Sequence, residues 1–202
     1  MMQPMPRVPP FDRPATYEDL VALDEIFIAE IIAGELYGTR RLPPRHSRTS
    51  TGLGLTLDAA GSLQARSSSP WWIFRAVEIH LGNDVVVPDW AAWRRHRFER
   101  FPATDNFSDA PDWVCEVLTP DTVALDRAKK LAIYAREQVA HAWLIDPLAR
   151  TLEVLRLESG RWTILATHAG SEAVRAEPFA AIDIDLAALW ADDPATDPPD
   201  RV

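Results

Sequence analysis

The sequence has a single cysteine, Cys115, among 202 residues. One cysteine excludes an internal disulfide framework and a zinc site built from several cysteines. No apolar run approaches the roughly 18 residues of a membrane-spanning helix. The first 14 residues contain five prolines and no apolar segment typical of a secretory signal. We therefore expect a cytoplasmic protein.

Glycine and histidine are also too sparse or too scattered for several common active sites. The eight glycines form no phosphate-binding loop, and no Gly-x-Ser-x-Gly sequence marks a hydrolase nucleophile. The five histidines lie far apart, without the spacing of a metal-ligating pair. These absences argue against nucleotide-cofactor enzymes and serine hydrolases. Most of the eight tryptophans fall in strand-like runs, so they indicate core packing or a subunit interface rather than a base-stacking surface.

The composition is that of a globular protein, with 47% apolar and 25% charged residues. The length fits one domain with tails. We place the domain at residues 15–190, after a proline-rich N-terminal tail, 1–14, and before an acidic, proline-rich C-terminal tail, 191–202.

The net charge of −9 argues against a general nucleic-acid-binding protein, whose surface is usually basic. Two local arginine clusters remain, at residues 40–48 and 94–100. Each is either a solvated loop or a set of contacts to nucleic-acid phosphates. In the second interpretation, the candidate phosphate contacts include Arg45, Arg94 and Arg95.

Lysine is rare, since only two of the 21 basic residues are lysines, the adjacent Lys129 and Lys130. A lysine kept against such an arginine bias suggests a site that needs a compact ammonium group. At 100° per residue, Lys130 borders the apolar face of a helix predicted over residues 126–137, whereas Lys129 faces solvent. Asp126 lies one turn earlier, where an i,i+4 contact can orient Lys130.

The remaining pattern mixes strands and helices. It predicts a short helix after a capping box at residues 16–19, a hairpin over 27–37 and a weak helix over 46–60. A strand–helix–strand unit over 113–146 indicates an α/β (α+β) protein. The predicted strands are 72–81, 85–87, 113–118, 142–146, 151–157 and 162–168, and a closing helix is predicted at 185–190.

Two carboxylates accompany apolar strands. Glu116 lies inside the predicted strand 113–118, and Asp89 follows the β-branched run 85–87. A buried carboxylate needs a cation, a metal or a hydrogen-bond network, although an edge strand or an arginine ion pair would also explain Glu116. Two strand carboxylates supply the hard oxygen ligands that Mg²⁺ prefers.

Taken in chain order, Asp89, the Glu116-Val117-Leu118 sequence and Lys130 resemble the PD-(D/E)XK nuclease superfamily. The chain resembles most closely its Uma-type branch of restriction-endonuclease-like proteins, over about residues 15–190. The superfamily lysine usually lies two residues after the strand glutamate, where this chain has Leu118. The branch places that lysine on the following helix, where Lys130 lies. Further matching segments are 30–35, 43–46, 87–89, 116–120, 126–130 with Tyr134, and 143–147.

The resemblance implies a restriction-endonuclease-like mixed β-sheet core flanked by helices, and metal-dependent hydrolysis of DNA phosphodiester bonds. Asp89 and Glu116 would hold Mg²⁺ or Mn²⁺, and Lys130 would assist catalysis. Glu30 would be an additional acid and His46 a candidate phosphate contact, and a homodimer would cut both DNA strands. The alternative is a catalytically silent nucleic-acid-binding or protein-interaction module on the same fold, which the acidic net charge favours.

Overall fold

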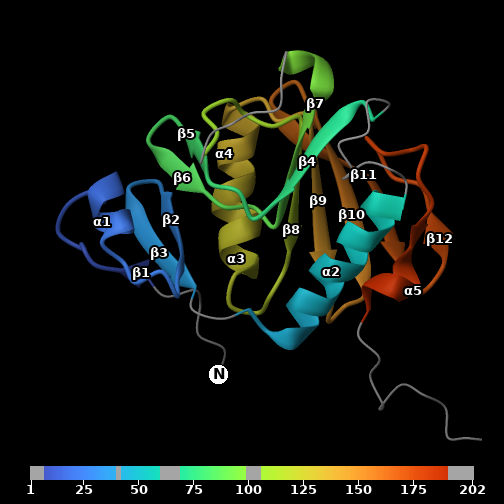
Figure 1. Ribbon diagram of the computed structural model, residues 1–202, viewed down its shortest axis with the longest axis horizontal. Coiled ribbons are helices and arrows are strands. Elements are labelled where there is room, and N and C mark those ends of the chain that lie inside the picture. Colours follow the sequence, from blue (N-terminus) through green and yellow to red (C-terminus); the bar gives the residue numbers. More distant parts are fainter. Residues whose placement is uncertain (1–6, 40–41, 60–68, 99–105, 191–202) are drawn as a thin grey trace, which may run out of the picture.

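The computed structural model describes residues 7–39, 42–59, 69–98 and 106–190 (Figure 1). Residues 1–6 of the predicted N-terminal tail and the whole predicted C-terminal tail lie outside these ranges, as do Arg40, Arg41 and Arg100 of the arginine clusters. Among the described residues, none of the helices qualifies as a membrane-spanning segment.

Two main sheets make up the fold, and a third sheet pairs only two short strands. The first sheet is entirely antiparallel. Its five strands are, in order, β1 (Arg7–Val8), β3 (Glu35–Thr39), β2 (Ile28–Ile32), β6 (Asp84–Val86) and β5 (Ile79–Leu81). We call it sheet A.

The second sheet, called sheet B, is mixed, because β8 and β9 are parallel and its other pairs are antiparallel. Its six strands are, in order, β11 (Arg161–Ala169), β10 (Thr151–Glu158), β9 (His141–Asp146), β8 (Trp113–Val117), β7 (Trp90–Arg94) and β4 (Trp71–Arg75). The two-stranded sheet pairs β12 (Ala173–Val174) with β13 (Ile184–Asp185).

Helices cover both faces of sheet B. On one face, Leu53 of α2 packs against Trp113 and Val117, together with residues of α5. On the other face, Val114 of β8 and Tyr134 of α4 belong to one core cluster. The helical segments are α1 (Tyr17–Val21), α2 (Pro44–Ala59), η1 (Arg95–Arg97), α3 (Val123–Leu125), η2 (Asp126–Lys130), α4 (Leu131–Arg136) and α5 (Leu186–Leu189).

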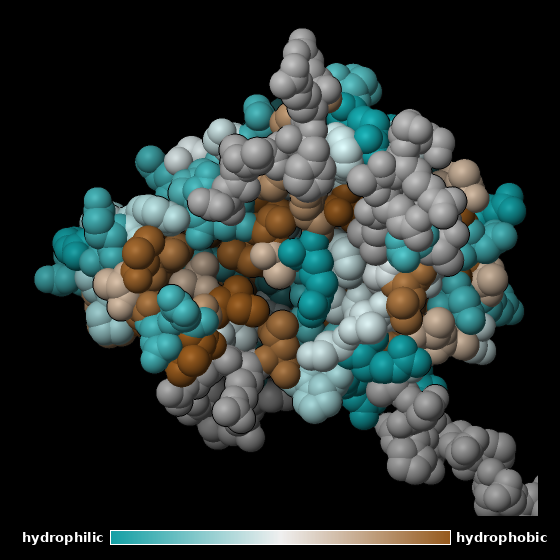
Figure 2. Space-filling view, in the orientation of Figure 1, coloured by the Kyte–Doolittle hydropathy of each residue, from teal (hydrophilic) through white to brown (hydrophobic). Residues whose placement is uncertain are grey.

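The continuous run α3–η2–α4 lies between the two sheets (Figure 1). Its Leu131 and Tyr134 share a core cluster with Ile32 and Val86 of sheet A and with Val114 of sheet B. Apolar side chains also gather at the surface between the N-terminal strands and α2 (Figure 2). The run therefore brings side chains from both sheets close to its own polar residues.

Most predicted elements are confirmed. The structure contains the hairpin β2–β3, the helix α2, the strands β8 to β11 and the closing helix α5. Side chains alternate along β8 as in a regular strand, because Trp113 and Val117 face α2 whereas Val114 faces α4. Part of the stretch assigned to an N-terminal tail, β1, pairs with β3.

Two predictions about elements are wrong. Residues 72–81 form no single strand: β4 and β5 belong to different sheets, and Ala76 between them has a left-handed φ of 49° that turns the chain. The predicted regular helix over 126–137 begins with a π-helical turn, in which the N–H of Leu131 donates to the carbonyl of Asp126, five residues earlier. A π-helical turn contains one residue more than an α-helical turn, and a hydrophobic pattern with a period of 3.6 residues does not reveal it.

Candidate active site

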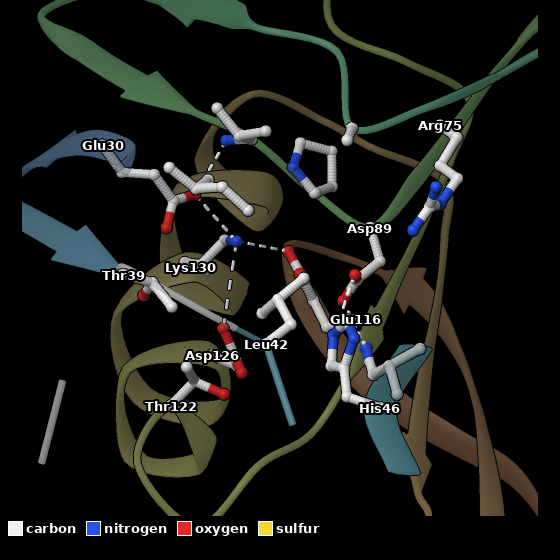
Figure 3. Close-up of a pocket in the computed structure, with 15 residues that line it drawn as sticks. Glu30, Thr39, Leu42, His46, Arg75, Asp89, Glu116, Thr122, Asp126 and Lys130 are labelled. Atoms are coloured by element: carbon white, nitrogen blue, oxygen red, sulfur yellow. Dashed lines mark hydrogen bonds and ion pairs between the residues drawn. The ribbon is translucent and has the colours of Figure 1, made fainter. Parts of the chain in front are cut away.

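A pocket of about 300 Å³ opens between the two sheets, beside the helical run (Figure 3). Its apolar wall includes Ile28, Leu42 and Val87. Its polar and charged lining residues come from β2, β3, α2, β4, the turn before β7, β8 and the α3–η2 segment. They are Glu30, Thr39, His46, Arg75, Asp89, Glu116, Thr122, Asp126 and Lys130.

Lys130 lies at the centre of the polar side chains, with only 3% of its side chain exposed. Its Nζ lies 2.9 Å from Glu30 Oε1 and 2.9 Å from Glu116 Oε1. Asp126 Oδ1 is 3.9 Å away, which confirms the predicted i,i+4 contact. Burial disfavours the ammonium, but Glu116 and Glu30 outweigh this effect and raise the pKa of Lys130 well above its usual value.

Glu116 lies on β8 and is as deeply buried as Lys130. Tyr134 Oη donates a hydrogen bond of 2.6 Å to Glu116 Oε1, the same oxygen that contacts Lys130. Burial raises the pKa of Glu116 well above its usual value, against the pull of Lys130. Burial also raises the pKa of Asp126, from 3.8 to about 7. The pocket therefore holds carboxyl groups whose charge is costly without a cation.

Asp89 lies immediately before β7, close to the end of β8. His46 Nε2 lies 2.9 Å from Asp89 Oδ1, and the backbone N–H of Val117 donates to Oδ2 over 2.8 Å. His46 is buried, and its Nδ1 has no hydrogen-bond partner among the described residues. Nε2 is therefore the nitrogen that donates to Asp89, because an N–H on Nδ1 would be an unsatisfied buried donor. His46 thus orients Asp89 in the structure.

Glu30, on β2 of sheet A, joins the other acids through Lys130. The backbone N–H of Val87 donates to Glu30 Oε1 over 2.7 Å. The predicted hairpin over residues 27–37 correctly places Glu30 on a strand. The approach of Glu30 to Lys130, however, depends on how sheet A packs against the helical run α3–η2–α4. Leu118, where the superfamily usually has lysine, packs in the core.

The donor set fits a hard divalent cation bound by few protein groups. The described residues include no group of three or more His, Cys, Asp or Glu side chains arranged to hold a metal ion. Mg²⁺ is often bound by only one or two carboxylates, with waters and a substrate phosphate completing its shell. Asp89 and Glu116 line one pocket and match that requirement.

The sequence-based candidates among the arginines lie elsewhere. The guanidinium of Arg94 stacks over Trp71, with its Cζ 3.9 Å from the ring centroid. That of Arg95 stacks over Trp72, with its Cζ 3.6 Å from the ring centroid. Neither arginine lines the pocket. Arg45 lines a neighbouring hollow of about 300 Å³, which shares His46 with the pocket.

One charged pocket residue, Arg75, was not predicted from the sequence. It is the last residue of β4 and pairs with Trp90, the residue after Asp89. No motif marks it in the sequence. The strand pairing that brings it to the pocket links positions 15 residues apart.

Comparison with known proteins agrees with this architecture. A family model, Uma2, described as "Putative restriction endonuclease", matches residues 14–188. A crystal structure from Anabaena variabilis, described as "a putative nuclease belonging to DUF820", has a TM-score of 0.70 and 21% identity. The match covers 87% of this chain and 97% of that chain, and confirms the restriction-endonuclease-like mixed fold. A search of curated proteins finds no match.

Proposed function

Because the chain belongs to the Uma2 family, we propose that it is a metal-dependent endonuclease that hydrolyses DNA phosphodiester bonds in the cytoplasm. The observation that carries the proposal is the meeting of three groups from separate elements. Asp89 precedes β7, Glu116 lies on β8 and Lys130 lies on η2, and all three line one pocket. The family description and the nuclease description of the structural relative support the same activity.

Asp89 and Glu116 are the residues that would hold Mg²⁺ or Mn²⁺. Each described hydrogen bond or ion pair of Glu116 uses Oε1, so Oε2 is the oxygen left for a cation. Each oxygen of Asp89 accepts one hydrogen bond and keeps a further lone pair. When bound, the metal would acidify water and polarise a phosphoryl oxygen.

The remaining groups keep the acids in place and handle charge. Lys130 holds Glu30 and Glu116 together and presents an ammonium group to the pocket, where it would orient the attacking water and stabilise charge developing on the phosphate. Glu30, the additional acid, would fix Lys130 from the side of sheet A. His46, which bonds to Asp89, would hold that carboxylate in place.

A cleavage assay tests the proposal. Supercoiled plasmid DNA is incubated with the protein and Mg²⁺ or Mn²⁺, and nicked and linear products are followed by electrophoresis. We expect cleavage by the wild type and loss of about 10²-fold or more in Asp89→Asn and Glu116→Gln, since each removes a charged ligand. Glu35→Gln is the control, because Glu35 pairs with Lys129 and Arg7 and does not line the pocket.

One observation favours the alternative function, a catalytically silent nucleic-acid-binding or protein-interaction module. Lys130 already neutralises part of the charge of Glu30 and Glu116, and this observation favours a site that needs no metal. Calorimetric titration with Mn²⁺ separates the two functions. A nuclease site gives binding that Glu116→Gln weakens, whereas absent binding together with absent cleavage would support the silent module.

We also propose a homodimer. One pocket in each chain would cleave one DNA strand, so two chains together would cleave both strands. Sedimentation velocity tests it. A species of twice the chain mass is expected, and a monomer that linearises plasmid in a single encounter would contradict it.

A further inference from the structure

Arg75 is exposed at the rim of the pocket that holds Asp89 and Glu116. We propose that Arg75 binds a backbone phosphate of the nucleic acid and positions the chain over the two acids. This inference rests on the proposed nuclease function and adds a substrate-binding residue to it.

The backbone fixes Arg75 beside Asp89. Arg75 pairs with Trp90 at the end of β4, and the N–H of Ala76 donates to the carbonyl of Asp89 over 3.1 Å. Ala76 has a φ of 49°, which is unfavourable for alanine. Such backbone strain concentrates at functional sites. Here it turns the chain directly after Arg75, at the pocket wall.

The side chain is also held from one side. Arg75 Nε donates to Ser50 Oγ over 3.3 Å, and this buried hydroxyl also accepts from Trp90 Nε1 over 3.0 Å. Ser50 lies one turn after His46 on α2, so the same helix face holds both Arg75 and Asp89. The contact uses one of the five guanidinium N–H groups, and no described residue bonds to the two terminal nitrogens, which are left for a ligand.

The charge of Arg75 has no partner among the described residues. No described carboxylate lies within ion-pair distance of it, although the pocket beside it contains four acids. Figure 3 shows its guanidinium directed toward the Asp89 side of the pocket. In contrast, seven other arginines that the structure describes pair with a carboxylate: Arg7, Arg13, Arg97, Arg127, Arg136, Arg156 and Arg175.

A phosphate diester suits this arrangement better than other anions. The planar guanidinium fork binds phosphate oxygens through two parallel hydrogen bonds. A polyanionic strand can contact Arg75 at the rim while its neighbouring phosphate lies over Asp89 and Glu116. A single small anion would gain only the first contact, against the repulsion of the acids.

The test measures binding of a fluorescein-labelled duplex by fluorescence anisotropy, with Ca²⁺ in place of Mg²⁺ and intact DNA verified by electrophoresis. The proteins are the wild type, Arg75→Ala, Arg75→Lys and the control Arg161→Ala, an exposed arginine on β11 outside the pocket. Between about 50 and 200 mM salt, Arg75→Ala should bind several-fold more weakly, with a salt slope smaller by about 1. Arg75→Lys should restore the slope but only part of the affinity, and Arg161→Ala should match the wild type.

The outcomes separate this inference from the nuclease proposal. If Arg75→Ala keeps the wild-type affinity and salt slope while plasmid cleavage persists, the role of Arg75 is overturned and the nuclease stands. If the wild type never cleaves but Arg75→Ala still weakens binding and lowers the slope, the phosphate contact is supported and the nuclease is overturned. A wild type that neither binds nor cleaves DNA overturns both. Thermal unfolding of each variant verifies that it is folded at the temperature of the binding measurement.

Discussion

The two adjacent lysines have different environments despite identical chemistry. The Lys129 side chain is 41% exposed, and its Nζ lies 2.6 Å from both Glu35 and Tyr37. Lys130 is buried between Glu30 and Glu116. The helical pattern correctly predicts that Lys130 turns toward the sheet, but it predicts Lys129 in solvent, without the ion pair to Glu35 that the structure shows.

This difference predicts unequal losses of stability. Lys130→Met leaves two buried carboxylates without their cation and should lower the free energy of unfolding by about 3–5 kcal/mol. Lys129→Met removes a partly exposed pair and should cost no more than about 1 kcal/mol. Urea denaturation of both variants, without divalent metal, measures the two values. Equal losses would show that the buried network contributes little.

Asp126 predicts a pH dependence of stability in the metal-free protein. Burial raises its folded-state pKa from 3.8 to about 7, so the folded protein holds this proton more tightly than the unfolded chain. Its contribution to stability therefore falls as the pH rises from about 4 to about 7. Asp126→Asn should remove that fall, and thermal unfolding in EDTA across this range would show it. The same pH profile in the variant and the wild type would contradict the assignment.

His46 predicts an effect on metal affinity rather than on phosphate contacts. Its bond to Asp89 fixes the carboxylate, so His46→Asn should weaken Mn²⁺ binding by about 10–100-fold, as is typical when a partner of a metal ligand is lost. Calorimetry measures the affinity. His80→Asn is the matched control, because His80 also bonds to a carboxylate, Glu78, but lies outside the pocket. An unchanged affinity in His46→Asn would exclude the positioning role.

Among the elements, α2 shows why glycine occurs inside a helix. The sequence predicts only a weak helix over residues 46–60, which contains Gly52 and Gly54. A Cβ on Gly52 would lie 2.3 Å from the carbonyl oxygen of Ala188, and one on Gly54 would lie 2.8 Å from the ring of Trp90. The glycines therefore allow close packing of α2 against α5 and β7, which in turn places His46 and Ser50 at the pocket.

Gly52→Ala should therefore destabilise the protein although alanine favours helix formation. We expect a loss of about 1–3 kcal/mol, because the backbone of α5 must shift to avoid overpacking. Thr51→Ala, at the neighbouring exposed position of α2, gains helix propensity without a clash and should be neutral or slightly stabilising. Chemical denaturation compares them. A stabilised Gly52→Ala variant would mean that α2 and α5 do not pack as closely as described.

The π-helical turn η2 is a second element whose local geometry positions a pocket residue. It winds one extra residue between Asp126 and Leu131, so Lys130 reaches the pocket while Leu131 stays in the core. Turns of this kind occur often at functional sites. The predicted helix face was correct for Lys130, but the regular helix assumed for it was not.

At the scale of the whole molecule, the net charge of −9 and the surplus of acids in the pocket repel the phosphates of DNA and so weaken its binding. We therefore expect duplex binding to require a divalent cation. Replacing Ca²⁺ with EDTA at constant ionic strength should weaken binding by about 10-fold or more, equivalent to about 1.4 kcal/mol. Anisotropy measures this change. Equal affinity in EDTA would mean that DNA binds away from the acids.

The sequence alone determined the mixed α+β class, most of the elements, and the order of Asp89, Glu116 and Lys130 along the chain. The class and the elements follow from local hydrophobic periodicity. The site residues stand out because a charge inside an apolar strand is costly to bury, and both signals can be seen in neighbouring residues of the sequence. Packing decided which distant groups meet: sheet A brings Glu30 to Lys130, and α2 brings His46 to Asp89. It also split residues 72–81 between two sheets and left Arg75 at the pocket. Such contacts join positions far apart in the chain, so no local spacing encodes them.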